Sequence, residues 1–449
     1  MAKHYDAVVI GAGPGGYQSA LHLGISGMKT LLIDKGKERV GGTCLNEGCI
    51  SSKAYLKAAR YLLSAPSMSD FGIQMQLEGL DMKRLKEKTV LLKDELRSGV
   101  LWQLEQTGVE FLAGTARFLD PHTLDVSGET ISFDKCIVAT GSQAQALASL
   151  PLDGKRVLSS RELFELETLP ASICIIGGGL IGCEFATFFS ALGCEVTLIV
   201  RSSALLSSED EDVSKVLLKA FKKRGIRVLT SATLQKAEVK EEGVELSVMT
   251  DVQEQISCEL VLCATGRLPF TQLLETQNAG IECDAKGFIC VNGTFQTSQK
   301  HIYAVGDCIN TLAYAHTAYA EAKIAAHNIL GGSLRENTHI TPSAIFTDPE
   351  IASCGLGEKA AKAQGRDIEI KKAFFKTNAK AKIEGDDSGF AKLIICAQSG
   401  MILGASVVGV EATEIIHEMV LAVEKQVCYQ EFKDIIHVHP SVSEIFRYL

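Results

Sequence analysis

Hydrophobic positions in the first half of the chain form short, β-rich runs, each followed by a glycine turn and a helical pattern. The run YDAVVI at 5–10 leads into GAGPGG, a helical pattern continues to Gly27, and a second apolar run covers 30–33. Continuous apolar runs of this length are typical of parallel strands buried on both faces. Strands that alternate with helices predict an α/β fold.

The same order of elements recurs further along the chain. SICII at 172–176 is followed by a glycine turn, a helical pattern to Gly193 and an apolar run at 195–200. An Ala-Thr-Gly turn closes the strand at 136–141 and again the strand at 260–266. Such repetition predicts two Rossmann-like dinucleotide-binding domains.

The pattern changes near residue 339. Alternating β-type runs predict an antiparallel sheet, and helical patterns cover 413–425 and 429–436. We therefore predict two Rossmann-like domains plus an α+β C-terminal interface domain. The expected divisions are a first nucleotide-binding domain (1–145), a second nucleotide-binding domain (146–270), a segment that returns to the first domain (271–335) and the interface domain (336–449). The first domain is expected to contain long helices at 54–63 and 80–106.

The first glycine loop has the complete dinucleotide pattern. Gly11, Gly13 and Gly16 fit G-x-G-x-x-G, and Asp34 ends the second strand. Glycines permit a tight turn and close approach of a pyrophosphate, the helix N-terminus attracts phosphate, and the acid binds a ribose hydroxyl.

The second loop, Gly177, Gly179 and Gly182, lacks that acid. Val200 stands in its place and Arg201 follows. An arginine there can bind a 2′-phosphate, as in NADP, or it can be merely solvated. Gly182 favours NAD, because alanine at that step often accompanies NADP. The two indications conflict.

Composition narrows the class of protein. The 449 residues carry 45 basic and 54 acidic side chains, a net charge of −9, which argues against nucleic acid or an anionic membrane as partner. No apolar run reaches the ~18 residues that span a bilayer. The fourteen cysteines are mostly single and lie in apolar runs, which indicates a reducing, cytoplasmic setting. No signal peptide is visible, and no cysteine spacing predicts a metal site.

One stretch, VGGTCLNEGCISSK at 40–53, holds Cys44 and Cys49. A disulfide needs Cα atoms within about 7 Å, whereas five steps of regular helix rise ~7.5 Å. A bridge here requires a distorted helix entrance, which Gly41, Gly42 and Gly48 would permit. The pair alone fits equally well as two buried cysteines of a core helix.

Two further positions carry candidate chemistry. His439 and Glu444 lie in the terminal HVHPSVSE, where a carboxylate could orient an imidazole base for thiol chemistry, or the histidine could be structural. Asp307, after YAVG, could accept a polyol hydroxyl or cap the following helix.

Together and in order, these motifs resemble the FAD-dependent pyridine nucleotide-disulfide oxidoreductases over nearly the full chain. The cysteine stretch, both glycine loops, both Ala-Thr-Gly turns, YAVGD, FTDPEIASCG and HPSVSE carry the resemblance. It implies an enzyme with FAD and a nicotinamide nucleotide. The residues implied to bind FAD are Gly11, Gly13, Gly16, Asp34, Lys35, Gly42, Thr43, Lys53, Ala116, Thr140, Gly141, Ser142, Asp307, Ala315 and His316. Those implied to bind NAD are Gly177, Gly179, Gly182, Glu184, Val200, Arg201 and Gly266.

The resemblance also implies a catalytic set. Cys44 would exchange with a thiol substrate, and Cys49 would lie against the flavin. Lys53 would pair with Glu184 near the flavin. His439 and Glu444 would form an acid–base dyad that reaches the cysteines of the partner subunit, in an obligate homodimer.

Leu45 and Ser52 favour the branch of this family that oxidises protein-bound dihydrolipoamide with NAD⁺. The expected partner is then the dihydrolipoyl-bearing acyltransferase core of a 2-oxo acid dehydrogenase complex. One alternative is an NADPH-linked reductase of a low-molecular-weight disulfide. Another is a non-catalytic flavoprotein that docks or acts as a scaffold.

The cysteine stretch departs from the family pattern at two positions. Glu47 replaces the usual valine, and Ser51 replaces the usual proline. A carboxylate between two cysteines disfavours a neighbouring thiolate. We therefore expect Glu47 to point outward.

Overall fold

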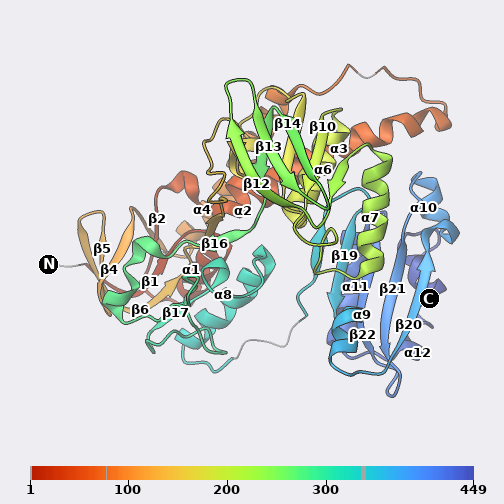
Figure 1. The fold of residues 1–449 in the computed structure, drawn as a ribbon. Helices are drawn as coiled ribbons and strands as arrows, with labels where there is room; N and C mark the ends of the chain where they lie inside the picture. The colour runs from red at the N-terminus through yellow and green to blue at the C-terminus, as the bar shows by residue number, and fades with distance from the viewer. Residues whose placement is uncertain (1–2, 77, 335–339) are drawn as a thin grey trace. The chain divides into compact units, whose positions relative to one another are not determined.

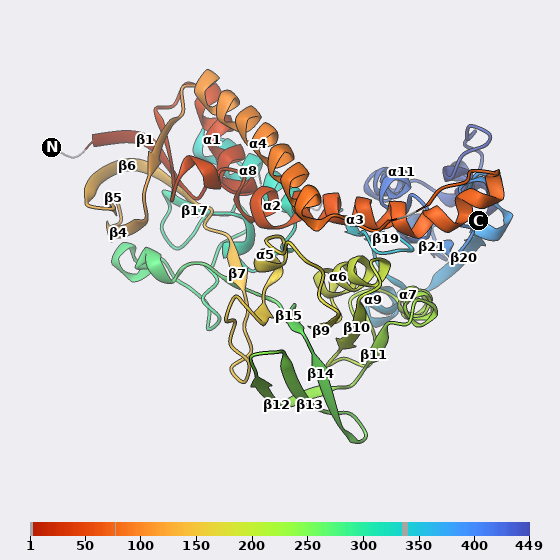
Figure 2. The same ribbon diagram turned by 90° about the horizontal axis from the view of Figure 1, so that it is seen from above.

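The computed structural model describes residues 3–76, 78–334 and 340–449 and is drawn in two views in Figures 1 and 2. The described residues form two compact units. Among these residues, unit 1 takes those within 1–52, 86–145 and 266–338, and unit 2 takes those within 53–85, 146–265 and 339–449.

Unit 1 is built on a seven-stranded sheet of order β3-β2-β1-β6-β5-β4, with β17 beside β6. The parallel strands are β1 (Lys3–Ile10), β2 (Thr30–Asp34), β3 (Glu110–Ala113), β6 (Glu129–Val138) and β17 (Ile302–Ala304), and the antiparallel edge is β4 (Ala116–Asp120) and β5 (Thr123–Val126). Val8, Val9 and Ile137 are fully buried. This burial on both faces explains the continuous apolar runs of the sequence.

Helices α1 (Pro14–Ile25) and α8 (Ala315–Ile329) pack against each other in unit 1 (Figure 2). The short helix α2 (Gly42–Glu47) precedes α3 (Cys49–Ser64), and α4 (Met82–Gln106) matches the long predicted helix within two residues. A two-stranded ribbon pairs β7 (Ser142–Ala144) with β16 (Arg267–Pro269). Short 3₁₀ turns are η1 (Lys37–Arg39), η2 (Ala65–Phe71), η3 (Gln272–Leu274), η4 (Thr276–Ala279) and η5 (Gly306–Cys308).

Unit 2 contains a second parallel sheet of order β11-β10-β9-β15-β8. Its strands are β8 (Val157–Leu158), β9 (Ser172–Ile176), β10 (Glu195–Ile199), β11 (Arg227–Leu229) and β15 (Leu260–Cys263), with helices α5 (Ser160–Leu163), α6 (Leu180–Ala191) and α7 (Glu211–Lys223). An antiparallel sheet of β12 (Thr233–Val239), β13 (Val244–Met249) and β14 (Gln253–Cys258) intervenes. This sheet was not predicted, although 244–248 alternates between apolar and polar positions.

The C-terminal part of unit 2 is a five-stranded antiparallel sheet of order β18-β19-β22-β21-β20. Its elements are β18 (Ser343–Ile345), β19 (Ile351–Gly355), α9 (Glu358–Ala363), β20 (Ile368–Phe374), η6 (Phe375–Thr377), α10 (Ala379–Ile383), β21 (Phe390–Cys396), β22 (Ile402–Val408), α11 (Ala412–Glu424), α12 (Tyr429–Phe432) and η7 (Ser443–Tyr448). The predicted antiparallel sheet is confirmed. The predicted helix 429–436 is wrong beyond Phe432, because Ile435 and Ile436 are exposed and bury no apolar face.

The fold class is confirmed: two dinucleotide-binding α/β sheets and an α+β C-terminal domain. The four-part domain division stays a prediction, and its boundary at 335/336 lies outside the described residues. Within the described ranges, no helix combines the length and apolar character needed to cross a membrane.

Candidate active site

The first glycine loop packs too closely for any side chain. Gly11 has a φ of +99°, and a Cβ built on it would lie 2.3 Å from the carbonyl oxygen of Ala139. A Cβ on Gly16 would lie 1.7 Å from the carbonyl oxygen of Gly11. The start of α1 therefore sits directly on the loop, as close approach of a pyrophosphate requires.

Asp34 is fixed at the end of β2. Its carboxylate accepts hydrogen bonds from the N–H groups of Ala12 (2.6 Å) and Lys35 (2.7 Å). Burial raises the pKa of Asp34, and these bonds and the charge of Arg39 only partly oppose the shift. The side chain is placed to accept a ribose hydroxyl beside the loop.

Two buried hydroxyls in unit 1 fit a polar cofactor. The Oγ1 atoms of Thr140 and Thr317 have no hydrogen-bond partner among the described residues. Thr317 lies in the first turn of α8, whose N-cap residue Tyr314 provides no side-chain cap. Buried polar groups are normally paired, so these atoms and the glycine cradle suit a bound FAD. Sequence reasoning missed Thr317, although its place at a helix N-terminus was a usable signal.

Asp307 belongs to a small polar network. Its Oδ2 accepts a hydrogen bond from the Ser142 hydroxyl at 2.6 Å, and Arg267 Nε donates to Ser142 Oγ at 2.7 Å. The helix-cap interpretation of Asp307 is wrong, because α8 begins only at Ala315. Arg267 was not predicted. The other residues implied to bind FAD, except Lys53, also lie in unit 1, as does Gly266 from the NAD set.

The cysteine stretch has the predicted distortion. Gly41 and Gly42 adopt φ values of +92° and +59°, which favour glycine. Helix α2 then ends at Glu47, Gly48 follows with φ −142° and ψ −115°, and α3 begins at Cys49. Cys44 is half-buried and Cys49 is exposed. The two thiols therefore lie on either side of a break between two helices.

Asn46 ties helix α2 to the segment that precedes it. Its Nδ2 donates to the carbonyl oxygens of Arg39 (3.1 Å), Val40 (3.2 Å) and Gly42 (2.8 Å). Arg97 of α4 donates to Asn46 Oδ1 at 2.6 Å. Asn46 was not among the predicted site residues, since an asparagine within a motif has no spacing signal of its own.

Two tyrosines stand beside the thiols. The hydroxyls of Tyr17 in α1 and Tyr319 in α8 are 2.8 Å apart. Burial, the bond to Tyr17 and the nearby Cys44 and Cys49 together raise the pKa of Tyr319. The raised pKa keeps the Tyr319 phenol neutral at physiological pH. Neither was predicted as a site residue.

Glu47 was predicted to point outward. It does not project freely into solvent. Its side chain is only 18% exposed and forms an ion pair with Arg39. Ser51, the second departure, is buried, and its hydroxyl donates weakly to the carbonyl oxygen of Asn46 at 3.4 Å.

The second glycine loop repeats the tight packing of the first. Gly177 has a φ of +123°, and a Cβ on Gly182 would lie 1.9 Å from the carbonyl oxygen of Gly177. Val200 is buried, and its methyl groups would lie 2.6 and 2.8 Å from a Cβ on Gly178. An apolar contact thus fills the position where the ribose acid was expected. Arg201 is exposed and forms no ion pair or hydrogen bond within the described residues.

Lys53 and Glu184 pair within unit 2. Lys53 Nζ lies 2.9 and 3.0 Å from the two carboxylate oxygens of Glu184. The N–H of Phe346 also donates to Glu184 at 3.0 Å. The buried carboxylate is therefore held by three hydrogen bonds.

His439 and Glu444 form the expected pair. His439 Nδ1 lies 3.0 and 3.1 Å from the carboxylate oxygens of Glu444. Hydrogen bonds from the Ser441 N–H and from His439 lower the pKa of Glu444. The histidine side chain is 70% exposed, whereas the carboxylate is 2% exposed. Nε2 is therefore accessible while the carboxylate fixes the ring.

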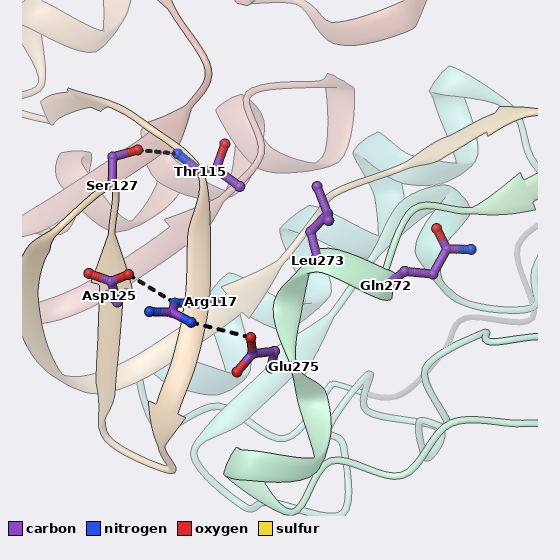
Figure 3. A pocket seen from close by; sticks show the side chains of 7 residues that line it. All are labelled: Thr115, Arg117, Asp125, Ser127, Gln272, Leu273 and Glu275. Atoms are coloured by element: carbon purple, nitrogen blue, oxygen red, sulfur yellow. Dashed lines mark hydrogen bonds and ion pairs between the residues drawn. The ribbon is translucent and has the colours of Figure 1, made fainter.

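A cavity of about 340 Å³ lies elsewhere in unit 1 (Figure 3). In it Arg117 binds Asp125 at 2.9 Å and Glu275 at 3.4 Å. None of the predicted site residues lines this cavity.

Comparisons with known proteins agree with the sequence motifs. Residues 5–322 match the pyridine nucleotide-disulphide oxidoreductase model, and 341–449 match the dimerisation domain of the same proteins. The chain is similar to the dihydrolipoyl dehydrogenases of Haloferax volcanii (33% identity, covering 99% of this chain and 95% of the relative) and Thermus scotoductus (35%, covering 98% and 96%). Two solved structures are also similar. They are the HOCl-induced flavoprotein disulfide reductase RclA from Escherichia coli (TM-score 0.90, 27% identity, 99% of both chains) and LpdA from Mycobacterium tuberculosis (TM-score 0.90, 26%, 99% of both).

Proposed function

This chain belongs to the pyridine nucleotide-disulphide oxidoreductase family, and from that premise we propose that it oxidises dihydrolipoamide through Cys44 and Cys49 with FAD and NAD⁺. The observation that carries the proposal is the pair of thiols on either side of the break between α2 and α3. Curated relatives that cover almost the whole chain are named dihydrolipoyl dehydrogenase, which supports this substrate.

The chain's own residues perform the thiol exchange. One substrate thiolate attacks Cys44 sulfur of the Cys44–Cys49 disulfide, and Cys49 leaves as a thiolate. The second substrate thiolate attacks the mixed disulfide, so that lipoamide leaves and both cysteines are reduced. Thiols titrate near 8.5, so His439 assists by accepting a substrate proton. FAD, when bound, supplies the transfer of the electron pair from the cysteines to the nicotinamide.

Lys53 and Glu184 are proposed to act at the flavin site. Lys53 brings a positive charge that Glu184 orients from its buried position. FAD would be held in the first glycine loop, by Asp34 and by the Asp307 network. The orphaned hydroxyls of Thr140 and Thr317 support this assignment.

A homodimer follows from the same proposal. Ile436 and Val438 are 96% and 79% exposed on either side of His437, and exposed apolar residues beside a site are typical of an interface. The match to a dimerisation domain supports this surface. His439 would then reach the thiols of the partner subunit. We further propose a cytoplasmic enzyme that serves the acyltransferase core of a 2-oxo acid dehydrogenase complex.

NADP(H) is a second candidate for the nicotinamide nucleotide. Val200 removes the carboxylate acceptor for a ribose hydroxyl, and Arg201 offers an available guanidinium. Gly182 supports NAD⁺ instead, because alanine at that step often accompanies NADP. Steady-state kinetics of Arg201→Ala with both nucleotides separate the two.

The thiol assignment is tested by substitution. We expect Cys44→Ser and Cys49→Ser each to lower NAD⁺-dependent oxidation of dihydrolipoamide at least about a thousandfold, as removal of a catalytic nucleophile commonly does. FAD content should stay unchanged, because neither thiol forms the glycine cradle. The measurement is steady-state turnover together with flavin absorbance.

Cys283→Ser is the matched control, because Cys283 is also exposed in unit 1. It should retain full turnover. Wild-type protein that carries FAD but oxidises no dithiol would support the non-catalytic alternative. Turnover of a low-molecular-weight disulfide with NADPH, without dihydrolipoamide activity, would support the reductase alternative.

A further inference from the structure

Glu47 creates an electrostatic problem for the neighbouring thiol. Cys44 and Glu47 are three residues apart in α2 (Gly42–Glu47), and such residues lie on one helix face with Cβ atoms about 5–6 Å apart. A carboxylate at that distance disfavours a thiolate. The low exposure of Glu47 limits screening by water. The residue therefore needs a counter-charge.

Arg39 supplies that charge. Its guanidinium Nη1 donates to Glu47 Oε1. The backbone of Arg39 is tied to the same helix, because its carbonyl oxygen accepts a hydrogen bond from Asn46 Nδ2 at 3.1 Å. Arg39 ends the turn η1 (Lys37–Arg39), and Val40 after it is fully buried. Arg39 is thus bound to α2 through both its backbone carbonyl and its guanidinium.

Other charged and titratable groups also face the cysteine stretch. From α4, Arg97 donates to Asn46 Oδ1 at 2.6 Å and Lys93 to the carbonyl oxygen of Asn46 at 3.3 Å. From α1 and α8 come the hydroxyls of Tyr17 and Tyr319, which lie 2.8 Å apart. Asp34 of β2 also feels the charge of Arg39. Lys93 and Arg97 bind Asn46, whereas Arg39 forms an ion pair with Glu47 itself.

We propose that Arg39 is a positioning residue of the redox pair, which neutralises Glu47 and thereby allows Cys44 to form the reactive thiolate near neutral pH. This inference rests on the assignment of Cys44 as the exchanging thiol under the proposed function. It goes beyond that function because it assigns a purpose to an ion pair that replaces the family's usual valine.

The test is the rate at which iodoacetamide alkylates Cys44 in the reduced holoenzyme, followed by peptide mass spectrometry between about pH 6 and 9. We expect Arg39→Gln to slow this alkylation about tenfold near pH 7, which corresponds to an upward shift of one pKa unit. Glu47→Gln should react as fast as wild type or faster. The double variant Arg39→Gln/Glu47→Gln should return to within about twofold of wild type, since no carboxylate remains to be neutralised.

Two controls are built into the chain. Lys37→Gln removes the same charge from the same turn, but Lys37 is exposed and is not bound to Glu47, so Cys44 should react at the wild-type rate. The exposed Cys283 and Cys290 should be alkylated equally in every variant. Alkylation of the buried Cys136 would report a loosened fold. In that case Arg39→Lys, which keeps the positive charge, replaces Arg39→Gln/Glu47→Gln as the rescue variant.

Wild-type alkylation of Cys44 in Arg39→Gln would overturn the proposal. So would a rescue variant that remains as slow as the single variant, because the effect would then not depend on charge. The assay needs no dihydrolipoamide. Failure of the proposed substrate and failure of this inference are therefore separate results.

Discussion

Single side chains decide the chemistry at both nucleotide loops. In the first, Asp34 presents a carboxylate that two backbone N–H groups hold. In the second, Val200 covers Gly178 with methyl groups and leaves Arg201 as the nearest polar side chain in sequence. The residue at the end of the second strand, Asp34 in one loop and Val200 in the other, thus distinguishes two loops of nearly the same backbone geometry.

Arg201→Ala is expected to lower kcat/KM for NADP(H) at least tenfold and for NAD(H) less than threefold. The reason is that only a 2′-phosphate requires the guanidinium, and hydrogen bonds to charged groups contribute about 1.5–3 kcal/mol. Val200→Glu should shift the preference toward NAD(H), because it restores a ribose acceptor.

Steady-state kinetics with both nucleotides measure this preference. We expect the wild type to prefer NAD⁺. A preference for NADPH above tenfold in the wild type would replace NAD⁺ by NADP(H) in the proposed function. Equal effects of Arg201→Ala on both nucleotides would show that the arginine does not read the 2′-position.

At the scale of elements, the two helices that follow the glycine loops begin where a glycine allows close packing against the end of a strand. The first turn of α1 packs directly on the loop after β1, because Gly16 has no side chain to collide with the carbonyl oxygen of Gly11. The same contact recurs between α6 and the loop after β9 at Gly182. This packing, rather than helix propensity, fixes where each nucleotide-binding helix starts.

Gly16→Ala and Gly99→Ala form a matched pair of helix substitutions. At Gly16 the new methyl would lie 1.7 Å from a carbonyl oxygen, so we expect a loss of about 1–3 kcal/mol or more and poor FAD retention. Gly99 in α4 has nothing within 4 Å of an added Cβ. There the substitution should stabilise the protein by about 0.5–1 kcal/mol.

Thermal unfolding and flavin content of the purified variants measure both effects. A Gly16→Ala protein with wild-type stability and bound FAD would contradict the packing argument. Destabilisation by Gly99→Ala would show that α4 is constrained in a way the open space around Gly99 does not suggest.

At the scale of the whole molecule, distant segments are joined by buried charges. Within unit 2, Lys392 of β21 has a side chain that is 0% exposed and lies 2.7 Å from Asp210 and 2.8 Å from Asp212, at the start of α7. Burial alone lowers the pKa of Lys392, but the hydrogen bonds to the two aspartates raise it overall. Helix α7 and the C-terminal sheet are therefore linked through one cation.

Lys392→Met should destabilise the protein by about 3–5 kcal/mol, because it leaves two carboxylates without their buried partner. Chemical denaturation measures the change. Lys240→Met, which removes a surface ion pair with Glu245, should change stability little. Adding Asp210→Asn and Asp212→Asn to Lys392→Met should recover part of the loss. A mild effect of the single variant would mean that water or Lys372 compensates the aspartates.

Local sequence patterns determined much of this protein. The parallel strands, glycine loops, cysteine break and terminal His-Glu pair could be predicted, because each depends on residues close together in the chain. Buried runs require apolar side chains, and a helix start beside a strand requires glycine. The family follows from the same motifs in the same order.

Only the tertiary structure decided which side chains pair, whether they lie close together or far apart in the chain. The Arg39–Glu47 pair, the Tyr17–Tyr319 contact and the burial of Lys392 have no periodic signal in the sequence. The partner of a charged side chain depends on which strands and helices pack together. The sequence shows that Glu47 is unusual, but its low exposure and its cation become apparent only when η1 and α2 are placed side by side.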